Sequence, residues 1–188
     1  MEIYVIRHTR VQVDSGVCYG QSDVLLHRDY LQHIAEVKHK FPSDFDKVFS
    51  SPLQRCTLLA AQLTSNEVIY DRRLMEMDFG LWENKTWDNI ASEQLDYWME
   101  NFVTTQTPDG ESLILLFQRV CAFVEQLRNQ THRRVALVTH AGVIRCIWAY
   151  LLDIPLENIF KLPVDYGHGL IFKLGSTKSL DQIIKTSF

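Results

Sequence analysis

Short apolar runs recur along the chain and give the first indication of its fold. Four of them are four to six residues long and rich in β-branched or aromatic residues, which is typical of buried β-strands. These runs cover residues 2–7, 47–50, 67–70 and 135–139. Two later segments, residues 169–173 and 180–184, predict further strands at the edge of a sheet.

Between these runs, apolar residues recur at spacings of three and four, which predicts amphipathic helices. The expected helices cover residues 29–41, 53–63, 111–128 and 144–152. Pro42 is placed to end the first helix, and Pro52 to start the second at its first turn.

Strands that alternate with helices predict parallel βαβ units, and hence a three-layer αβα sandwich with a mainly parallel sheet. The 188 residues contain no visible linker or repeat, so we expect one domain over residues 1–188. In such folds ligands bind beyond the carboxyl ends of the strands. His8, Ser51 and His140 each follow a predicted strand, so topology alone brings these residues together.

Residues 72–102 differ from the rest of the chain. The segment holds three of the four tryptophans, and its polar residues interrupt any long periodicity. We therefore expect a loop followed by one or two helices, forming an aromatic-rich cap over the site.

Charge and composition exclude several classes of protein. The net charge is −4 and the basic residues are scattered, so a nucleic-acid partner is not expected. No apolar run approaches the roughly 20 residues of a membrane-spanning helix, and the first residues lack the pattern of a signal peptide. We expect a cytoplasmic protein, while the oligomeric state is left open. A small anionic ligand could still use a local cationic pocket.

The cysteine and histidine spacings indicate neither a disulfide framework nor a metal site. The four cysteines form no CxxC pair and lie among apolar residues, which favours buried, reduced thiols. Neither His8 nor His140 belongs to an HExxH motif or a similar cluster. We therefore expect no metal and no cofactor, and a metal-dependent hydrolase is poorly supported.

Five short blocks combine cations, imidazoles and a carboxyl group in the settings described above. They are Arg7-His8-Thr9, Ser50–Arg55, Leu74–Glu83, Pro108–Ser112 and His140-Ala141-Gly142. In these blocks and in their order, the chain resembles the histidine phosphatase superfamily, which has the phosphoglycerate-mutase-like fold. The resemblance extends over nearly the whole chain and implies a metal-independent phosphatase that acts on a small phosphorylated metabolite.

The resemblance also implies a role for individual residues. His8 is the implied nucleophile that forms a phosphohistidine, and Arg7 and Arg55 are the implied bidentate ligands of the phosphoryl oxygens. His140 is the implied hydrogen-bonding partner of the phosphoryl group. Glu76 is the implied acid and base of the two half-reactions. Taken singly, each of these residues is as readily explained by packing or by solvation.

The chain departs from the family pattern just after the nucleophile. Many relatives continue with Gly-Glu-Thr and carry an asparagine that touches phosphate, whereas this chain has Thr9-Arg10-Val11 and an aspartate, Asp14, near the asparagine's place. A carboxylate would repel phosphate, so that contact is not carried over. Arg10 is either a surface residue or a ligand of a second anionic group.

Within the superfamily the resemblance is closest to the α-ribazole phosphatases, which act in the assembly of the cobalamin nucleotide loop. It rests on Tyr19–Asp23, Glu76–Glu83 and Pro163–Gly167. For this substrate, Gln21 and Trp82 are candidate binding residues. The flat base of α-ribazole needs a stacking surface, and aromatic residues of the cap can provide one, although core packing is the commoner role of such residues.

Other functions remain open at this level. A broad-specificity sugar phosphatase is a serious alternative. A phosphoglycerate mutase needs more basic residues over its pocket than this cap offers, since Lys85 stands among several acids. An inactive phospho-ligand binding module is disfavoured because His8, Arg55, Glu76 and His140 are all present.

Overall fold

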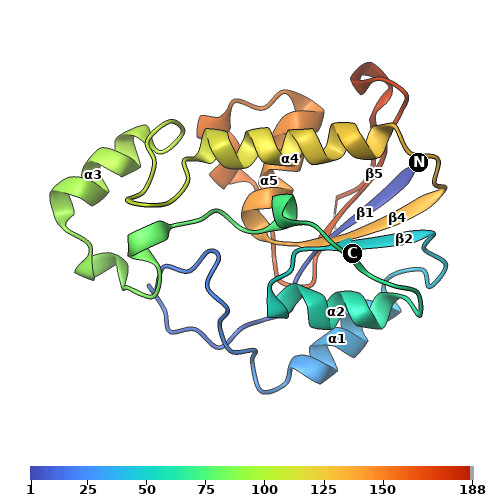
Figure 1. Ribbon diagram of the computed structural model, residues 1–188, viewed down its shortest axis with the longest axis horizontal. Coiled ribbons are helices and arrows are strands. Elements are labelled where there is room, and N and C mark those ends of the chain that lie inside the picture. Colours follow the sequence, from blue (N-terminus) through green and yellow to red (C-terminus); the bar gives the residue numbers. More distant parts are fainter. Residues whose placement is uncertain (187–188) are drawn as a thin grey trace.

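A mixed β-sheet lies at the centre of the molecule in the computed structural model, which describes residues 1–186 (Figure 1). Within this range the sheet has six strands in the order β3-β2-β4-β1-β5-β6. The strands are β1 (Glu2–Arg7), β2 (Lys47–Ser50), β3 (Ile69–Tyr70), β4 (Arg134–Thr139), β5 (Gly169–Lys173) and β6 (Gln182–Lys185). Strands β1 to β4 run parallel to one another, while β5 is antiparallel to β1 and β6 to β5.

Helices cover both faces of this sheet, as expected for an αβα sandwich. The α-helices are α1 (Tyr30–His39), α2 (Gln54–Leu63), α3 (Ser92–Asn101), α4 (Leu113–Arg128) and α5 (Ala141–Leu152). Short 3₁₀ turns are η1 (Arg72–Leu74), η2 (Gly80–Trp82), η3 (Trp87–Asn89), η4 (Leu156–Lys161) and η5 (Lys178–Leu180). Figure 1 shows α1 and α2 below the sheet and α4 and α5 above it.

The strand sequences explain why both faces are covered. Alternate residues of a strand point to opposite faces, and in β1 both sets are apolar. Ile3 and Val5 pack into the core beneath α4 and α5, whereas Ile6 packs into the second core against α1 and α2. The predicted fold class, with its mainly parallel sheet, is therefore confirmed.

Several element boundaries differ from those expected; α1 and α4, for example, each begin one or two residues later. Strand β3 is reduced to Ile69–Tyr70, and β6 starts only at Gln182 because η5 occupies the preceding residues. Pro52 lies outside α2, whose N-cap is Leu53, so it does not begin the helix as predicted. Helix α5 begins at Ala141, three residues earlier than expected, because the small residues after His140 already form its first turn.

The segment 72–102 contains three 3₁₀ turns and α3, in agreement with the expected loop and helix. In Figure 1, α3 stands apart from the sheet, beyond the start of α4. Among residues 1–186, no helix is both long and apolar enough to cross a membrane.

Candidate active site

A cavity of about 240 Å³ opens beyond the carboxyl ends of the parallel strands. All five residues assigned catalytic roles from the sequence line it: Arg7, His8, Arg55, Glu76 and His140. They come from the end of β1, the first turn of α2, the loop after η1 and the N-cap of α5. The cavity therefore lies where the topology of a parallel sheet places a ligand.

His8 is buried at the end of β1 and is held in one orientation. Its Nδ1 lies 2.8 Å from the carbonyl oxygen of Thr9, which can only accept, so Nδ1 carries the proton. Burial, together with the guanidinium charges of Arg55 and Arg7, holds the pKa of His8 well below its usual value. The ring is thus neutral, with its lone pair on Nε2.

His140 lies beside His8, with 5.1 Å between the ring centroids. Its Nδ1 accepts a hydrogen bond from Nε of Arg55 at 3.3 Å, and its Nε2 lies 2.8 Å from the Ser51 hydroxyl. Burial, followed by the electrostatic influence of the adjacent His8 ring and of Arg55, lowers the pKa of His140 well below its usual value. His140 is therefore neutral in the empty cavity, and both of its nitrogens are engaged.

The two arginines are held by backbone carbonyls and by a pair of tyrosines. Arg7 donates from Nη1 to the Val164 carbonyl at 2.6 Å, and its guanidinium carbon lies 3.7 Å from the centre of the Tyr166 ring. The buried Arg55 donates to the carbonyls of Gly20 and Ser22 at 2.5 and 2.8 Å.

Tyr19 and Tyr166 connect the two cations. The Tyr19 ring lies 5.6 Å from the guanidinium carbon of Arg55, and its hydroxyl is 2.8 Å from that of Tyr166. Burial and this hydrogen bond raise the pKa of Tyr19. Tyr19 therefore stays uncharged, and the faces of the two tyrosine rings favour the positive charge of the arginines.

Glu76 reaches the cavity from the loop after η1 and lies against the first turn of α5. Its Oε1 accepts from the Met77 amide at 3.0 Å and its Oε2 from the Gly142 amide at 3.1 Å. A carboxylate is favoured at a helix N-terminus, where the amides lack partners within the helix.

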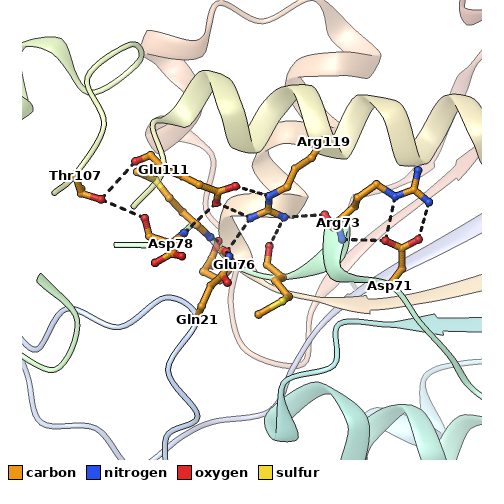
Figure 2. A network of polar contacts seen from close by, with 10 residues as sticks. Gln21, Asp71, Arg73, Glu76, Asp78, Thr107, Glu111 and Arg119 are labelled. Carbon is orange, nitrogen blue, oxygen red and sulfur yellow. Dashed lines mark hydrogen bonds and ion pairs between the residues drawn. The ribbon is translucent and has the colours of Figure 1, made fainter. Parts of the chain in front are cut away.

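A partly buried network fixes the backbone that carries Glu76 (Figure 2). Arg119 of α4 donates to the carbonyls of Arg73, Met75 and Glu76 at 2.7–2.8 Å. The same guanidinium forms two hydrogen bonds of 2.8 Å with the Glu111 carboxylate. Glu76 is thus positioned by a group that lies 43 residues further along the chain.

Gln21 belongs to this supporting structure. Its amide nitrogen Nε2 donates to the Glu76 carbonyl at 3.1 Å, and its backbone amide donates to Glu83 at 2.7 Å. It is not among the residues that line the cavity, as far as residues 1–186 are concerned. A substrate ligand was expected to contact the cavity. The structure instead places Gln21 behind Glu76.

Trp82 is also placed differently from the expectation. Only 4% of its surface is exposed, and it packs into the core against Trp98 with 5.6 Å between the ring centroids. Trp87 and Phe79 line the cavity in its stead. Aromatic composition alone does not indicate which ring faces inward, since all of these rings have the same apolar character.

Arg145 lines the cavity and was not predicted. It lies on α5, four residues after Ala141, and its Nε donates to the Leu162 carbonyl at 3.0 Å. Burial lowers the pKa of Arg145. The spacing of Arg145 in the sequence could have indicated its position. It lies one helical turn after Ala141, and residues one turn apart lie on the same side of a helix.

The residues that depart from the family pattern lie away from the cavity. Arg10 and Asp14 are exposed, and neither lines it. Arg10 instead borders a separate hollow beside His33 and His168. Three of the four cysteines, Cys18, Cys56 and Cys146, are buried thiols as expected, whereas Cys121 is only partly buried. In the described part of the chain, no three histidine, cysteine or acidic side chains gather where they could hold a metal ion.

Comparison with known proteins identifies the family to which the chain belongs. Residues 3–179 match the model of the histidine phosphatase superfamily (branch 1). Phosphoserine phosphatase 1 of Hydrogenobacter thermophilus is 29% identical over 64% of this chain and 60% of its own. The Escherichia coli protein GpmB, whose name refers to phosphoglycerate mutase activity, is 27% identical over 90% of this chain and 87% of its own.

The crystal structure of the α-ribazole phosphatase from Shigella flexneri is similar over the whole chain. It superposes with a TM-score of 0.89, covering 100% of this chain and 96% of that one, at 23% sequence identity. This likeness shows that the two proteins share a fold.

Proposed function

The chain is a phosphatase of the histidine phosphatase superfamily, and we propose that it hydrolyses small phosphate monoesters through a phosphohistidine formed on His8. The observation that carries this proposal is the state of the His8 ring. The hydrogen bond from Nδ1 to Thr9 and the lowered pKa leave a neutral imidazole with a lone pair on Nε2. That atom is the nucleophile such chemistry requires.

The reaction proceeds in two steps. In the first, Nε2 of His8 attacks phosphorus in line with the ester oxygen, so that a P–N bond forms while the P–O bond breaks. Glu76 donates a proton to the departing oxygen. In the second step a water molecule attacks the same phosphorus, Glu76 takes up a proton from it, and inorganic phosphate leaves as the P–N bond breaks.

The charge on the phosphoryl oxygens is stabilised by cations fixed in the cavity before the substrate arrives. Arg7 and Arg55 provide the planar groups that match phosphoryl oxygens. His140 is neutral in the empty cavity, and a bound dianion favours its uptake of a proton. Because these charges are already in place, little reorganisation is needed during the reaction.

Substitution of the two central residues tests the mechanism. We expect His8→Ala to lower kcat by at least about a thousandfold, since it removes the nucleophile. Glu76→Gln is expected to cost roughly 10²–10⁴-fold with alkyl esters, and less in the first step with p-nitrophenyl phosphate, whose leaving group needs no proton. The direct readout is a labelled phosphoenzyme that is trapped by rapid quenching and loses its label in acid. Full activity in His8→Ala would overturn the proposal.

No metal takes part in these steps, because the positive charge that phosphoryl transfer requires comes from Arg7 and Arg55. Activity should therefore be unchanged after dialysis against a chelator. Loss of activity there, with recovery on addition of a divalent cation, would contradict this part of the proposal.

For the physiological substrate we propose α-ribazole 5′-phosphate. The support is the resemblance of Tyr19–Asp23 and Pro163–Gly167 to that subfamily and the shared fold with the Shigella flexneri enzyme. Two residues of these blocks, Tyr19 and Tyr166, hold the cations of the cavity. The segments that carry the resemblance therefore also supply side chains that pack against the arginines of the cavity.

A second candidate, phosphoserine, is favoured by Arg145. Its guanidinium group lines the cavity in addition to Arg7 and Arg55, and could pair with a substrate carboxylate. The name of the Hydrogenobacter thermophilus relative agrees with it. A panel of α-ribazole 5′-phosphate, phosphoserine, 3-phosphoglycerate and sugar phosphates, assayed in chelator, separates the candidates by kcat/KM.

A further inference from the structure

A second, larger hollow adjoins the catalytic cavity. It is a groove of about 650 Å³, and three of its lining residues, Phe79, Trp87 and Phe160, also line the cavity that holds His8. A ligand whose phosphoryl group lies at His8 can therefore extend past these rings into the groove.

The groove is built almost entirely from aromatic and apolar side chains of the cap. Trp87 is stacked on Trp98 with a ring separation of 6.2 Å and an interplanar angle of 22°. Phe102 joins this group to Phe160, 5.2 Å away. Such a wall, with faces and edges at several angles, suits a flat ring system.

Two of these apolar side chains are exposed. Met99 and Phe160 keep 60% and 54% of their surface in contact with solvent. A contiguous exposed apolar patch is uncommon in a protein unless it binds something. Asp96 is the one charged residue among those that line the groove within the described chain, which disfavours a second anionic group there.

We propose that this groove binds a flat, apolar ring of the substrate's leaving group, while the smaller cavity holds the phosphoryl group and a compact polar spacer such as a pentose. The inference rests on the proposed phosphatase function and deepens it. It names the substrate class as monophosphates of ring-bearing sugars, in contrast with small phosphorylated amino or hydroxy acids.

The test compares two substrates that differ in the ring alone, ribose 5-phosphate and a benzimidazole riboside 5′-phosphate. Stacking of one ring on aromatic side chains is expected to raise kcat/KM about tenfold for the second ester. Equal kcat/KM for the two esters would overturn the inference.

A matched pair of variants on α3 locates the effect. Met99 lines the groove, whereas Tyr97, 62% exposed on the same helix, does not. Met99→Asp should reduce the ratio of kcat/KM between the two esters to near one, and Tyr97→Asp should leave the ratio as in the wild type. Phe160→Ala, outside α3, should lower the ratio as well, which guards against a local effect on that helix.

The outcomes distinguish the two proposals. Activity that survives His8→Ala on both esters refutes the proposed mechanism. Activity that depends on His8 but shows no ring preference, or a ratio that Met99→Asp leaves unchanged, refutes the groove alone. If Met99→Asp instead dissociates an oligomer in sedimentation while the ratio persists, the groove is a contact between copies of the chain and the inference fails.

Discussion

At Gly142 the chain needs a residue without a side chain, because the Glu76 carboxylate occupies that space. A Cβ atom built on Gly142 would lie 2.2 Å from Oε1 of Glu76. The backbone of Gly142 is helical and its amide donates to Oε2 of the same carboxylate. The contact is with the end of a flexible side chain, so Glu76 can move away and the helix is retained.

Substitution of Gly142 should therefore move activity and stability in opposite directions. Gly142→Ala is expected to lower kcat by roughly 10²-fold or more, because Glu76 loses its position as the acid and base. The free energy of unfolding should change little or rise by up to about 1 kcal/mol, since alanine favours the helix. Steady-state kinetics and urea titration measure the two quantities.

The control for this prediction is the double variant Glu76→Ala/Gly142→Ala. If the alanine at position 142 acts only by displacing Glu76, it has no further effect on kcat once that carboxylate is gone. A large additional loss in the double variant would show that Gly142 acts in some other way.

Single residues were predictable where the topology fixes them. His8 and His140 follow strands whose apolar pattern is clear, so their meeting follows from a parallel sheet. Trp82 and Gln21 were not predictable in this way, because the direction of a side chain in an irregular segment depends on distant contacts. Trp82 packs against Trp98, and Gln21 reaches the carbonyl of Glu76.

At the scale of elements, helix α4 holds the loop that carries Glu76. Arg119 lies on this helix and joins Glu111 to three carbonyls of the segment 73–76 (Figure 2). Only 17% and 20% of the Arg119 and Glu111 side chains are exposed. In that setting the removal of one partner leaves a charge and several carbonyls without hydrogen bonds.

Arg119→Met should accordingly reduce both stability and turnover. We expect the free energy of unfolding to fall by about 3–5 kcal/mol and kcat to decrease more than KM changes, because Glu76 is displaced while the arginines that bind phosphate remain. A suitable control is Arg133→Met, which breaks an exposed ion pair with Asp44 and should cost less than about 1 kcal/mol. Equal losses in the two variants would contradict this assignment.

The elements themselves were largely foreseen, and the exceptions have local causes. The apolar periodicity predicts the central strands because they are buried on both faces, and it predicts α4 because this helix is long. The start of α5 was missed because Ala141 and Gly142 carry no apolar pattern, yet it is their small size that lets Glu76 approach the helix. The Arg119 network was not foreseeable, since it joins segments more than forty residues apart.

At the scale of the whole molecule, a chain of net charge −4 places three of its arginines at one cavity. Arg7, Arg55 and Arg145 line it together with two histidines. Burial, together with the arginines that suit a phosphoryl group, keeps these histidines neutral. Keeping both imidazoles neutral lowers the free energy of unfolding at acidic pH, because unfolding exposes them to water, where they bind protons.

This cost predicts how stability depends on pH. In the folded state the pKa values of His8 and His140 lie well below the ordinary value, whereas in the unfolded chain both groups titrate at about 6.5. Below that pH the unfolded state binds more protons, so the free energy of unfolding falls by up to about 1.4 kcal/mol per pH unit for each histidine. Above it, these two groups contribute no pH dependence.

Urea titrations between pH 7.5 and 5 measure this slope, in a range that lies above the titration of the carboxylates. His8→Gln removes one of the two groups, and burial still depresses the pKa of His140. The variant should therefore lose stability about half as steeply as the wild type while the pH falls from 6.5 to 5. An identical slope in the two proteins would show that folding does not lower the pKa of His8. The ring would then be protonated below about pH 6.5, and a protonated ring has no lone pair with which to attack phosphorus.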